Sequence, residues 1–133
     1  MPAIDGILET ALYVDDLSRS SRFYQTIFGF KPVAGDGERF MALHITGRQI
    51  LLLFPKRRAP SAAHLAHEGN GRLHLAWAIA TEELAAWEAW LHQHGLVVEE
   101  KKHWERGGWS LYFRDPDGHL LEVATPGIWP GVY

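Results

Sequence analysis

The sequence predicts an α+β protein made of two tandem copies of one βαβββ module. Two observations carry this prediction. Each half of the chain reads, in the same order, as one strand, one helix and three further strands. The two predicted helices also end at glycines, Gly29 and Gly95, which stand at equivalent points of the two halves. Internal repetition of this kind fixes the architecture of a chain before its single elements are bounded.

The first half begins with a predicted strand over residues 8–14, in which apolar side chains dominate. A helix follows, because apolar residues recur at helical spacing between a capping residue, Asp16 or Ser18, and the glycine that stops the helix, Gly29. The remaining predicted strands of this half cover residues 30–34, 39–46 and 48–55.

The second half repeats this order, starting with a predicted strand over residues 73–80. Its helix is expected to begin at Thr81 as the N-cap, with acidic residues in the first turn, and to end at Gly95. The apolar side chains of this helix are expected to face the core, and they are Leu84, Trp87, Trp90 and Leu91. The remaining predicted strands cover residues 96–102, 107–114 and 119–126.

These elements divide the chain into two modules within one predicted domain of 133 residues. The first module covers about residues 7–55 and the second about 72–126, with a polar linker over 56–71. The tail, 127–133, is apolar and holds a proline, so we expect it to pack on a partner subunit or over a pocket rim instead of forming a helix.

Composition narrows the functional classes. The net charge of −3 shows no basic excess, so nucleic acid is not an expected partner. The chain has no cysteine, so any metal site must use His, Asp or Glu. No basic and apolar leader and no membrane-length apolar run is present, which predicts a cytoplasmic protein without a membrane partner.

One carboxylate in the first strand does not fit an apolar environment. Glu9 lies among apolar residues, and a buried carboxylate needs a partner, a proton or a metal. Overlaying the two halves on their repeated glycines places His74 at the point equivalent to Glu9, and Leu51 at the point equivalent to Glu122. The repeat therefore defines four equivalent corners, one of them apolar.

The repeated βαβββ pattern, with "YVDDLSRSSRFYQTIFGF" in the first half and "LYFRDPDGHLLEV" in the second, resembles the vicinal oxygen chelate superfamily. This superfamily includes glyoxalase I, extradiol dioxygenases, and fosfomycin- and bleomycin-resistance proteins. The resemblance implies a curled mixed sheet around a central cup, with helices on the outer faces and a divalent cation held by inward residues of the first and last strands. It also implies a homodimer that acts on a small molecule.

Strand alternation supports a cation site at three of the corners. Glu9, His74 and Glu122 each lie on the strand face that carries small alanines, while bulky apolar residues occupy the other face. These residues are the predicted metal ligands. One imidazole and two carboxylates suit Zn²⁺, Ni²⁺, Mn²⁺, Co²⁺ or Fe²⁺ and leave positions for substrate. Glu9 and Glu122 are also the predicted catalytic residues, one of them moving a proton.

Four further residues are predicted to contact substrate. Tyr112 and Ser110 match positions that contact substrate in fosfomycin-resistance proteins, as the resemblance implies. Tyr13 is a second candidate hydroxyl donor, and His44 is a candidate general base.

The resemblance fixes the fold more narrowly than the reaction. The favoured function is a glyoxalase-like lyase or isomerase whose substrate chelates the metal through neighbouring oxygens. The alternatives are a non-catalytic bleomycin-resistance-type binding protein, an extradiol dioxygenase and a fosfomycin-type transferase. Leu51 stands near the corner where glyoxalase I enzymes have a fourth ligand, and Glu9 replaces one of the two His ligands of the dioxygenases and transferases.

Overall fold

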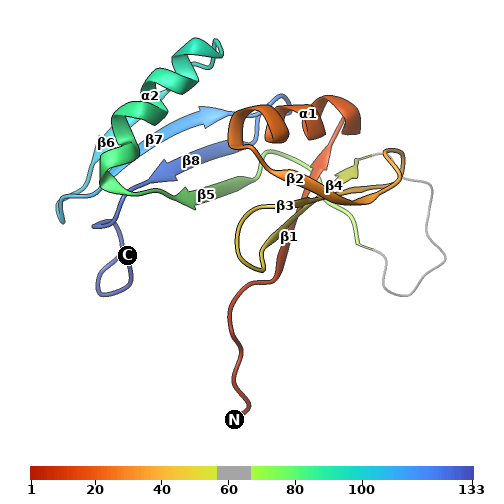
Figure 1. Ribbon diagram of the computed structural model, residues 1–133, viewed down its shortest axis with the longest axis horizontal. Helices are drawn as coiled ribbons and strands as arrows, with labels where there is room; N and C mark the ends of the chain where they lie inside the picture. Colours follow the sequence, from red (N-terminus) through yellow and green to blue (C-terminus); the bar gives the residue numbers. More distant parts are fainter. Residues whose placement is uncertain (57–66) are drawn as a thin grey trace. The chain divides into compact units, whose positions relative to one another are not determined.

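The computed structural model describes residues 1–56 and 67–133. The chain divides into two compact units, Met1–Gly71 and Arg72–Tyr133, called unit 1 and unit 2 below (Figure 1). The division falls at the end of the predicted linker. Most of that linker, residues 57–66, lies outside the described residues.

Unit 1 contains a four-stranded mixed sheet with the strand order β1-β4-β3-β2. The outer strand β1 pairs with β4 in parallel, and the other neighbours are antiparallel. The elements of unit 1 are β1 (Glu9–Val14), α1 (Leu17–Phe28), β2 (Lys31–Gly35), β3 (Met41–His44) and β4 (Ile50–Pro55).

Unit 2 repeats the same sheet, with the order β5-β8-β7-β6 and a parallel pair formed by β5 and β8. The elements of unit 2 are β5 (His74–Ala78), the short 3₁₀ helix η1 (Thr81–Glu83), α2 (Leu84–Gln93), β6 (Glu100–His103), β7 (Trp109–Arg114) and β8 (Leu120–Ala124). The α+β class and the doubled βαβββ order are therefore confirmed. The strands form two separate open sheets instead of one continuous sheet.

Helix α1 begins and ends where its sequence indicates. The carboxylate of Asp16 accepts a hydrogen bond from the backbone N–H of Arg19, which satisfies one of the free donors at the helix start. Gly29 ends the helix with a φ of 69°, a conformation that glycine adopts without steric cost. Tyr24 and Ile27 are buried on its inner face, and the Tyr24 ring stacks on Phe30.

Helix α2 differs from its prediction at two places. Thr81 is not the N-cap, because it is the first residue of η1, which precedes α2. The residue before η1 is Ala80, and no side chain caps η1. Glu83 N–H instead bonds to the carbonyl of Ala80, a 3₁₀ contact that replaces the side-chain cap. Trp90 is also not a core residue, since it is exposed and its ring lies against His94, whereas Leu91 is fully buried.

Each sheet has one face on which several apolar side chains are fully buried. In unit 1 this face includes Leu43, Leu51 and Leu53, and in unit 2 it includes Leu111, Leu121 and Val123. These residues occupy adjacent strands in register, so their side chains point to the same side of their sheet. The alternation of apolar residues therefore assigns the buried face correctly in both units.

The strand register corrects one equivalence between the halves. Glu9 pairs with Ile50, and His74 pairs with Leu120, so Glu122 corresponds to Leu52 and not to Leu51. Leu51 instead corresponds to the buried Leu121. The glycine overlay failed by one position because the first hairpin has one more residue between its turn glycine and the start of the last strand.

The C-terminal tail packs on its own unit. The Tyr133 hydroxyl donates to the backbone carbonyls of Ile79 and Ala124, at 2.9 and 3.1 Å, and so joins the ends of β5 and β8. Trp129 in the same tail remains exposed. None of the helices in the described part of the chain has the length and apolarity needed to cross a lipid bilayer.

Candidate functional site

Three polar side chains and one alanine form a row across the sheet of unit 2. Glu122 on β8 pairs with Ala76 on β5 and with Tyr112 on β7, which in turn pairs with Glu100 on β6. Paired residues on adjacent strands share one face of a sheet, so these four form a continuous row. We call Ala76, Glu122, Tyr112 and Glu100 the polar row. It lies on the face opposite to the buried leucines.

His74 lies beside this row and meets Glu122. The His74 Nε2 atom is 3.3 Å from the Glu122 Oε2 atom. The His74 side chain is about half exposed, with 49% of its surface accessible, whereas only 6% of the Glu122 side chain is accessible. The other ring nitrogen, Nδ1, is 2.9 Å from the backbone carbonyl of Leu120.

This backbone contact determines which ring nitrogen of His74 carries the proton. A carbonyl oxygen only accepts, so Nδ1 of His74 must carry a proton and donate it. In the neutral ring, Nε2 then presents its lone pair toward Glu122. Metal-binding histidines have the same arrangement, with the second nitrogen held by a carbonyl or carboxylate.

One oxygen of Glu122 is buried without a partner. Oε1 is the only buried side-chain N or O atom of the described residues that lacks a hydrogen bond. An unpaired buried carboxylate oxygen is costly, because the protein replaces none of the water that it loses. A bound cation would remove this cost.

The donor set of the pair therefore fits a divalent metal. Two ligands at roughly 2.0–2.2 Å from one ion, at neighbouring coordination positions, lie about 3 Å apart. The separation of 3.3 Å between His74 Nε2 and Glu122 Oε2 is close to that value. One imidazole nitrogen and one carboxylate oxygen are ligands that Mn²⁺, Fe²⁺, Co²⁺, Ni²⁺ and Zn²⁺ accept.

Tyr112 is held at the centre of the polar row. Burial raises the pKa of its phenol above the ordinary value, a hydrogen bond with Ser110 opposes this, and the nearby Glu122 carboxylate raises it further. The ring also lies against His74, with ring centres 6.4 Å apart. The phenol thus stays protonated at neutral pH and can donate a hydrogen bond at this face.

Unit 1 places an apolar row at the equivalent positions. Ala11, Leu52 and Ala42 pair across β1, β4 and β3 where unit 2 has Ala76, Glu122 and Tyr112. Of the predicted metal ligands, this unit holds only Glu9.

Glu9 is exposed, and its side chain forms no hydrogen bond or ion pair within the described ranges. Among residues 1–56 and 67–133, no cluster of three potential His, Asp or Glu ligands is present. The structure therefore brings together two of the three predicted ligands, and the addition of Glu9 stays a prediction.

The remaining predicted site residues have local partners. In unit 1 the Tyr13 hydroxyl is hydrogen-bonded to Nδ1 of His67, and its ring stacks on Phe54. His44 Nε2 is 3.0 Å from the carbonyl oxygen of Gly47. Ser110 is fully buried in unit 2 beside the polar row. Their roles toward substrate stay predictions.

Sequence reasoning missed two partners of these residues. Trp104 donates its indole N–H to the Ser110 hydroxyl at 2.9 Å, and His67 meets Tyr13 from the far end of the linker. Neither contact follows a strand or helix period. The glycine pair Gly107 and Gly108, which stands between Trp104 and Trp109 and marks a loop, was the one available signal for the first contact, and nothing marked the second.

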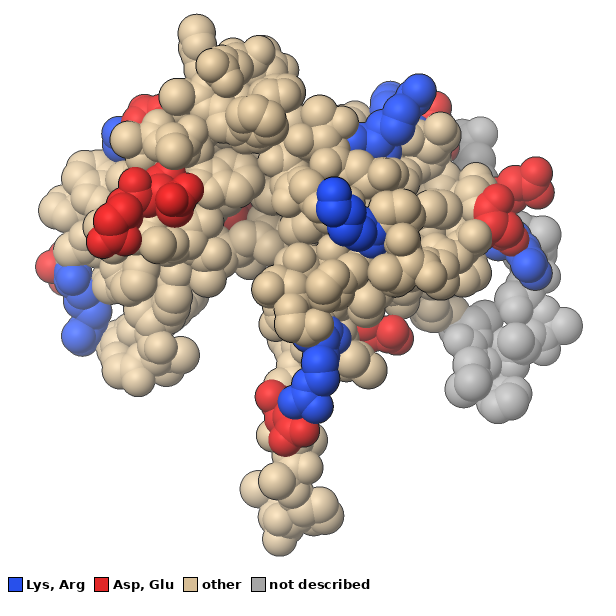
Figure 2. Space-filling view, viewed as in Figure 1, with Lys and Arg blue, Asp and Glu red and all other residues tan. Residues whose placement is uncertain are grey.

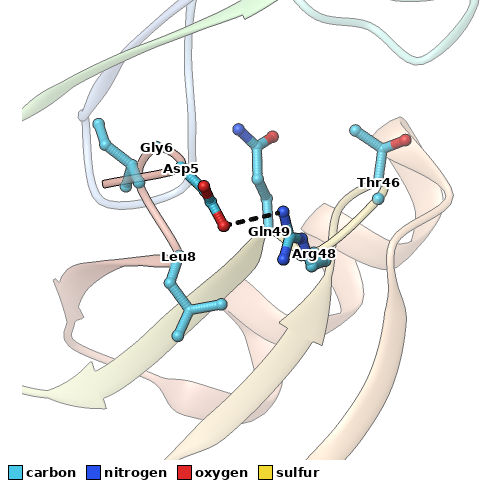
Figure 3. A pocket seen from close by; sticks show the side chains of 8 residues that line it. Asp5, Gly6, Leu8, Thr46, Arg48 and Gln49 are labelled. Carbon is cyan, nitrogen blue, oxygen red and sulfur yellow. Dashed lines mark hydrogen bonds and ion pairs between the residues drawn. The ribbon is translucent and has the colours of Figure 1, made fainter. Parts of the chain in front are cut away.

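Unit 1 also has a surface pocket beside the start of β1. This pocket has a volume of about 560 Å³ and lies between the segment before β1 and the turn that joins β3 to β4 (Figure 3). The ion pair between Asp5 and Arg48, at 3.5 Å, crosses it. Both side chains are about 80% exposed, so this pair contributes little to stability. No candidate site residue lines the pocket.

The absence of a nucleic-acid partner stays a prediction from the net charge. On the face in Figure 2, the basic side chains that the structure describes are scattered, several of them beside acidic ones. A nucleic-acid surface needs clustered Lys and Arg.

The fold and the polar row define a βαβββ-repeat protein with a candidate metal pair on its second unit, and sequence comparison gives its family. A profile of the Glyoxalase/Bleomycin resistance protein/Dioxygenase superfamily matches residues 6–123. The chain belongs to this superfamily.

Individual relatives carry different activities in their names. The chain is 32% identical to the metallothiol transferase FosB of Bacillus licheniformis over 124 residues, which cover 92% of this chain and 77% of that protein. Among solved structures, the lactoylglutathione lyase of Agrobacterium tumefaciens superposes with a TM-score of 0.87 at 30% identity, covering 97% of this chain and 99% of the other. The fosfomycin resistance protein FosX of Listeria monocytogenes shares the fold, with a TM-score of 0.69 at 24% identity over 91% of this chain and 90% of the other.

Proposed function

We propose that this protein is a divalent-metal-dependent enzyme of the glyoxalase-like lyase or isomerase type. Its substrate is a small molecule that chelates the metal through neighbouring oxygens. Glu9, His74 and Glu122 are the proposed ligands. The observation that carries the proposal is the His74–Glu122 pair, in which a ligand-ready imidazole faces a buried carboxylate with one unpartnered oxygen.

Tyr112 and the two carboxylates, Glu122 and Glu9, would act on the bound substrate. A cation held by Glu9, His74 and Glu122 would supply Lewis-acid polarisation of a substrate carbonyl. Tyr112 donates a hydrogen bond to a substrate oxygen from its protonated phenol. A carboxylate, Glu122 or Glu9, takes a proton from the neighbouring carbon and returns it. Ala76, which is exposed at the β5 end of the row, leaves room for the substrate.

A second candidate is transfer of a thiol to a metal-held substrate. The apolar Leu52 favours it, because unit 1 then offers no carboxylate at the corner equivalent to Glu122 to serve as an additional ligand and base. The relatives named metallothiol transferase support the same reading. This reaction requires the three-ligand site and an added thiol, but no second base from β4.

Metal content and two assays test the proposal together. We would purify the protein without a His tag, measure bound transition metals by mass spectrometry, and reload it with Mn²⁺, Ni²⁺ or Zn²⁺. The assays would be conversion of the hemithioacetal of methylglyoxal and glutathione, and consumption of a low-molecular-weight thiol with fosfomycin. The first activity supports the lyase, and the second supports the transferase.

Matched carboxamide variants assign the ligands. Glu9→Gln and Glu122→Gln are expected to lose metal and activity. Glu100→Gln is the control, because Glu100 ends the same polar row on β6 but is exposed. A wild-type protein that binds no metal after reloading would contradict the enzyme and favour a ligand-binding protein of the bleomycin-resistance type.

We also propose that the protein is a homodimer. Large apolar side chains are exposed before β1 and in the tail, at Ile4, Ile7, Leu8 and Trp129. Surfaces of this kind are typical of protein–protein contacts. Light scattering during size-exclusion chromatography measures the mass directly, and a monomer at micromolar concentration would contradict the proposal.

A further inference from the structure

The turn between β7 and β8 ends in a histidine that reaches the start of β5. His119 immediately precedes β8 and is fully buried. The Nδ1 atom of its ring lies 2.9 Å from the backbone nitrogen of Leu73, the residue before His74. A backbone N–H only donates, so Nδ1 of His119 is the acceptor, and the proton of the neutral ring is on Nε2.

The turn that carries His119 is closed by one buried carboxylate. Oδ1 of Asp115 accepts the backbone N–H groups of Asp117 and His119, each at 2.9 Å. Gly118, which lies between them, has a φ of 81°, a conformation that glycine adopts without steric cost. Its carbonyl accepts a hydrogen bond from Nη1 of Arg114 at 3.1 Å. The backbone of His119 is therefore fixed within the turn itself.

Both polar backbone groups of Leu73 bond to consecutive residues of this segment. Its N–H bonds to the His119 ring, and its carbonyl accepts the N–H of Leu120 at 2.8 Å. The hydrogen bonds of a parallel ladder are evenly spaced, so a longer ladder would offer Leu73 the carbonyl of Gly118. The His119 side chain thus supplies the last acceptor of the ladder, at the point where the backbone turns away.

The same segment holds the ring of His74. Its Nδ1 donates to the carbonyl of Leu120 at 2.9 Å, and its backbone follows Leu73 directly. Glu122 lies on β8, two residues after Leu120, and its Oε2 atom is 3.3 Å from His74 Nε2. The separation of the two proposed ligands therefore depends on how the start of β5 is held against the start of β8.

The equivalent position of unit 1 holds an exposed glutamine. The strand register places Gln49 where unit 2 has His119. The ladder bond itself is present, since the N–H of Ile50 bonds to the carbonyl of Leu8 at 2.9 Å. The Gln49 side chain, however, forms no hydrogen bond or ion pair within residues 1–56 and 67–133. The βαβββ sheet thus forms without this contact, which occurs in the unit that holds the His74–Glu122 pair.

We propose that His119 is a positioning residue, which holds the start of β5 through Leu73 and so fixes the imidazole of His74 against Glu122. The inference deepens the proposed function and rests on it for the role of His74 as a metal ligand. His119 itself is not a ligand. All of these contacts belong to unit 2, so they can be measured in the metal-free protein.

The first measurement detects the contact in the unaltered protein. In a ¹⁵N-labelled sample, a hydrogen bond from an amide to an imidazole nitrogen gives a scalar coupling between the two nitrogens in the NMR spectrum. We expect this coupling between the Leu73 amide and Nδ1 of His119. Its absence would overturn the proposal before any variant is made.

Two substitutions at His119 separate the acceptor from the bulk of the ring. His119→Asn keeps an acceptor, because Oδ1 of asparagine is attached to Cγ as Nδ1 of histidine is, whereas His119→Leu fills the space without one. The readout is the ring ¹⁵N shifts of His74 in the metal-free protein, assigned by their loss in His74→Gln. We expect the wild type and His119→Asn to show His74 protonated at Nδ1, and His119→Leu to show a mixture of tautomers.

Gln49→Leu is the matched control, because it introduces leucine at the equivalent position of unit 1. We expect the His74 shifts to stay unchanged in this variant. The proposal is overturned if His119→Leu leaves the His74 shifts unchanged, or if His119→Asn alters them as much, because the effect would then come from packing. If His119→Leu does not fold, His119→Asn decides alone: wild-type shifts support the proposal, and those of a tautomer mixture overturn it.

The last measurement connects His119 to the metal pair. Mn²⁺ affinity is measured by competition with a chelator for the wild type, both His119 variants and Gln49→Leu. Outer partners of a metal site contribute about 10- to 100-fold in affinity, so we expect a loss of about tenfold in His119→Leu and a smaller one in His119→Asn. Equal affinity of wild type and His119→Leu would overturn the proposal. A wild type that binds no Mn²⁺ would contradict the proposed function, while the NMR measurements on the metal-free protein would still decide whether His119 positions His74.

Discussion

The two units build the same sheet and use the equivalent positions differently. Unit 1 has Ala11, Leu52 and Ala42 in the row where unit 2 has Ala76, Glu122 and Tyr112. The opposite faces are alike, since each holds fully buried leucines. The apolar face is thus similar in both units and stabilises the fold, whereas the residues on the other face differ between the units. In the proposed site, unit 2 supplies His74, Glu122 and Tyr112, and unit 1 supplies one exposed carboxylate, Glu9.

Replacing Glu122 by leucine, the residue that unit 1 has at the equivalent position, should abolish the difference in metal binding between the two units. Glu122→Leu is expected to lower Mn²⁺ affinity by more than about 100-fold, since even outer partners of a metal site contribute about 10- to 100-fold. Isothermal titration with Mn²⁺ measures this. Leu52→Met, at the equivalent position of unit 1, should leave the affinity unchanged. Equal losses in both variants would contradict the assignment of the site to unit 2.

The shared buried faces should respond alike. Leu51→Ala in unit 1 and Leu121→Ala in unit 2 each empty a fully buried, equivalent position. Each is expected to lower the free energy of unfolding by about 2–5 kcal/mol, the usual cost of such a cavity. Urea unfolding followed by circular dichroism measures both. A negligible cost at either position would show that the two faces are not equivalent.

When no metal is bound, the buried carboxylate of Glu122 is expected to lower the stability of unit 2. Glu122 is buried with one unpartnered oxygen, whereas Leu52 has no polar atom in its side chain. Glu122→Leu removes the desolvation cost of this carboxylate, and the His74 ring that it leaves without its partner is about half exposed. Glu122→Leu should therefore raise the midpoint of thermal unfolding of the metal-free protein. A lowered midpoint would mean that the carboxylate stabilises the fold.

The smallest expected effect concerns the tail of unit 2. Burial raises the pKa of the Tyr133 phenol above its ordinary value of about 10. A group with a raised pKa in the folded state contributes stability below its unfolded pKa, and that contribution is lost as pH rises through the folded pKa. Unfolding free energy should thus fall above about pH 10, and less steeply in Tyr133→Phe. Identical slopes would show that folding does not raise the pKa of Tyr133.

Strand alternation was sufficient to predict both faces of each sheet. It placed His74 and Glu122 on one face and Leu121 on the other, because the side-chain period of a strand does not depend on the rest of the fold. The pairing register between strands was predicted less accurately, because Leu51 was taken as the equivalent of Glu122 where the structure has Leu52. The exact length of a turn decides register, and a repeat of glycines does not fix that length.

Contacts made by loops and helix surfaces were beyond the sequence. Trp104 reaches Ser110 from a loop, and such a contact follows no period. Trp90 was expected in the core because it belongs to the apolar stripe of α2. In the structure Leu91 of this helix is fully buried, whereas Trp90 lies at the surface. Periodicity predicts which face of an element is apolar, but tertiary packing decides how much of that face is covered.

Counting the imidazole ligands of the bound metal tests the central claim most directly. Mn²⁺ bound to the untagged protein, labelled with ¹⁵N at histidine, is examined by electron spin-echo envelope modulation, which detects directly coordinated ring nitrogens. The account predicts one coordinated histidine, lost in His74→Gln and retained in His44→Gln. Two coordinated histidines, or one that persists in His74→Gln, would contradict the pair of His74 and Glu122 as the core of the site.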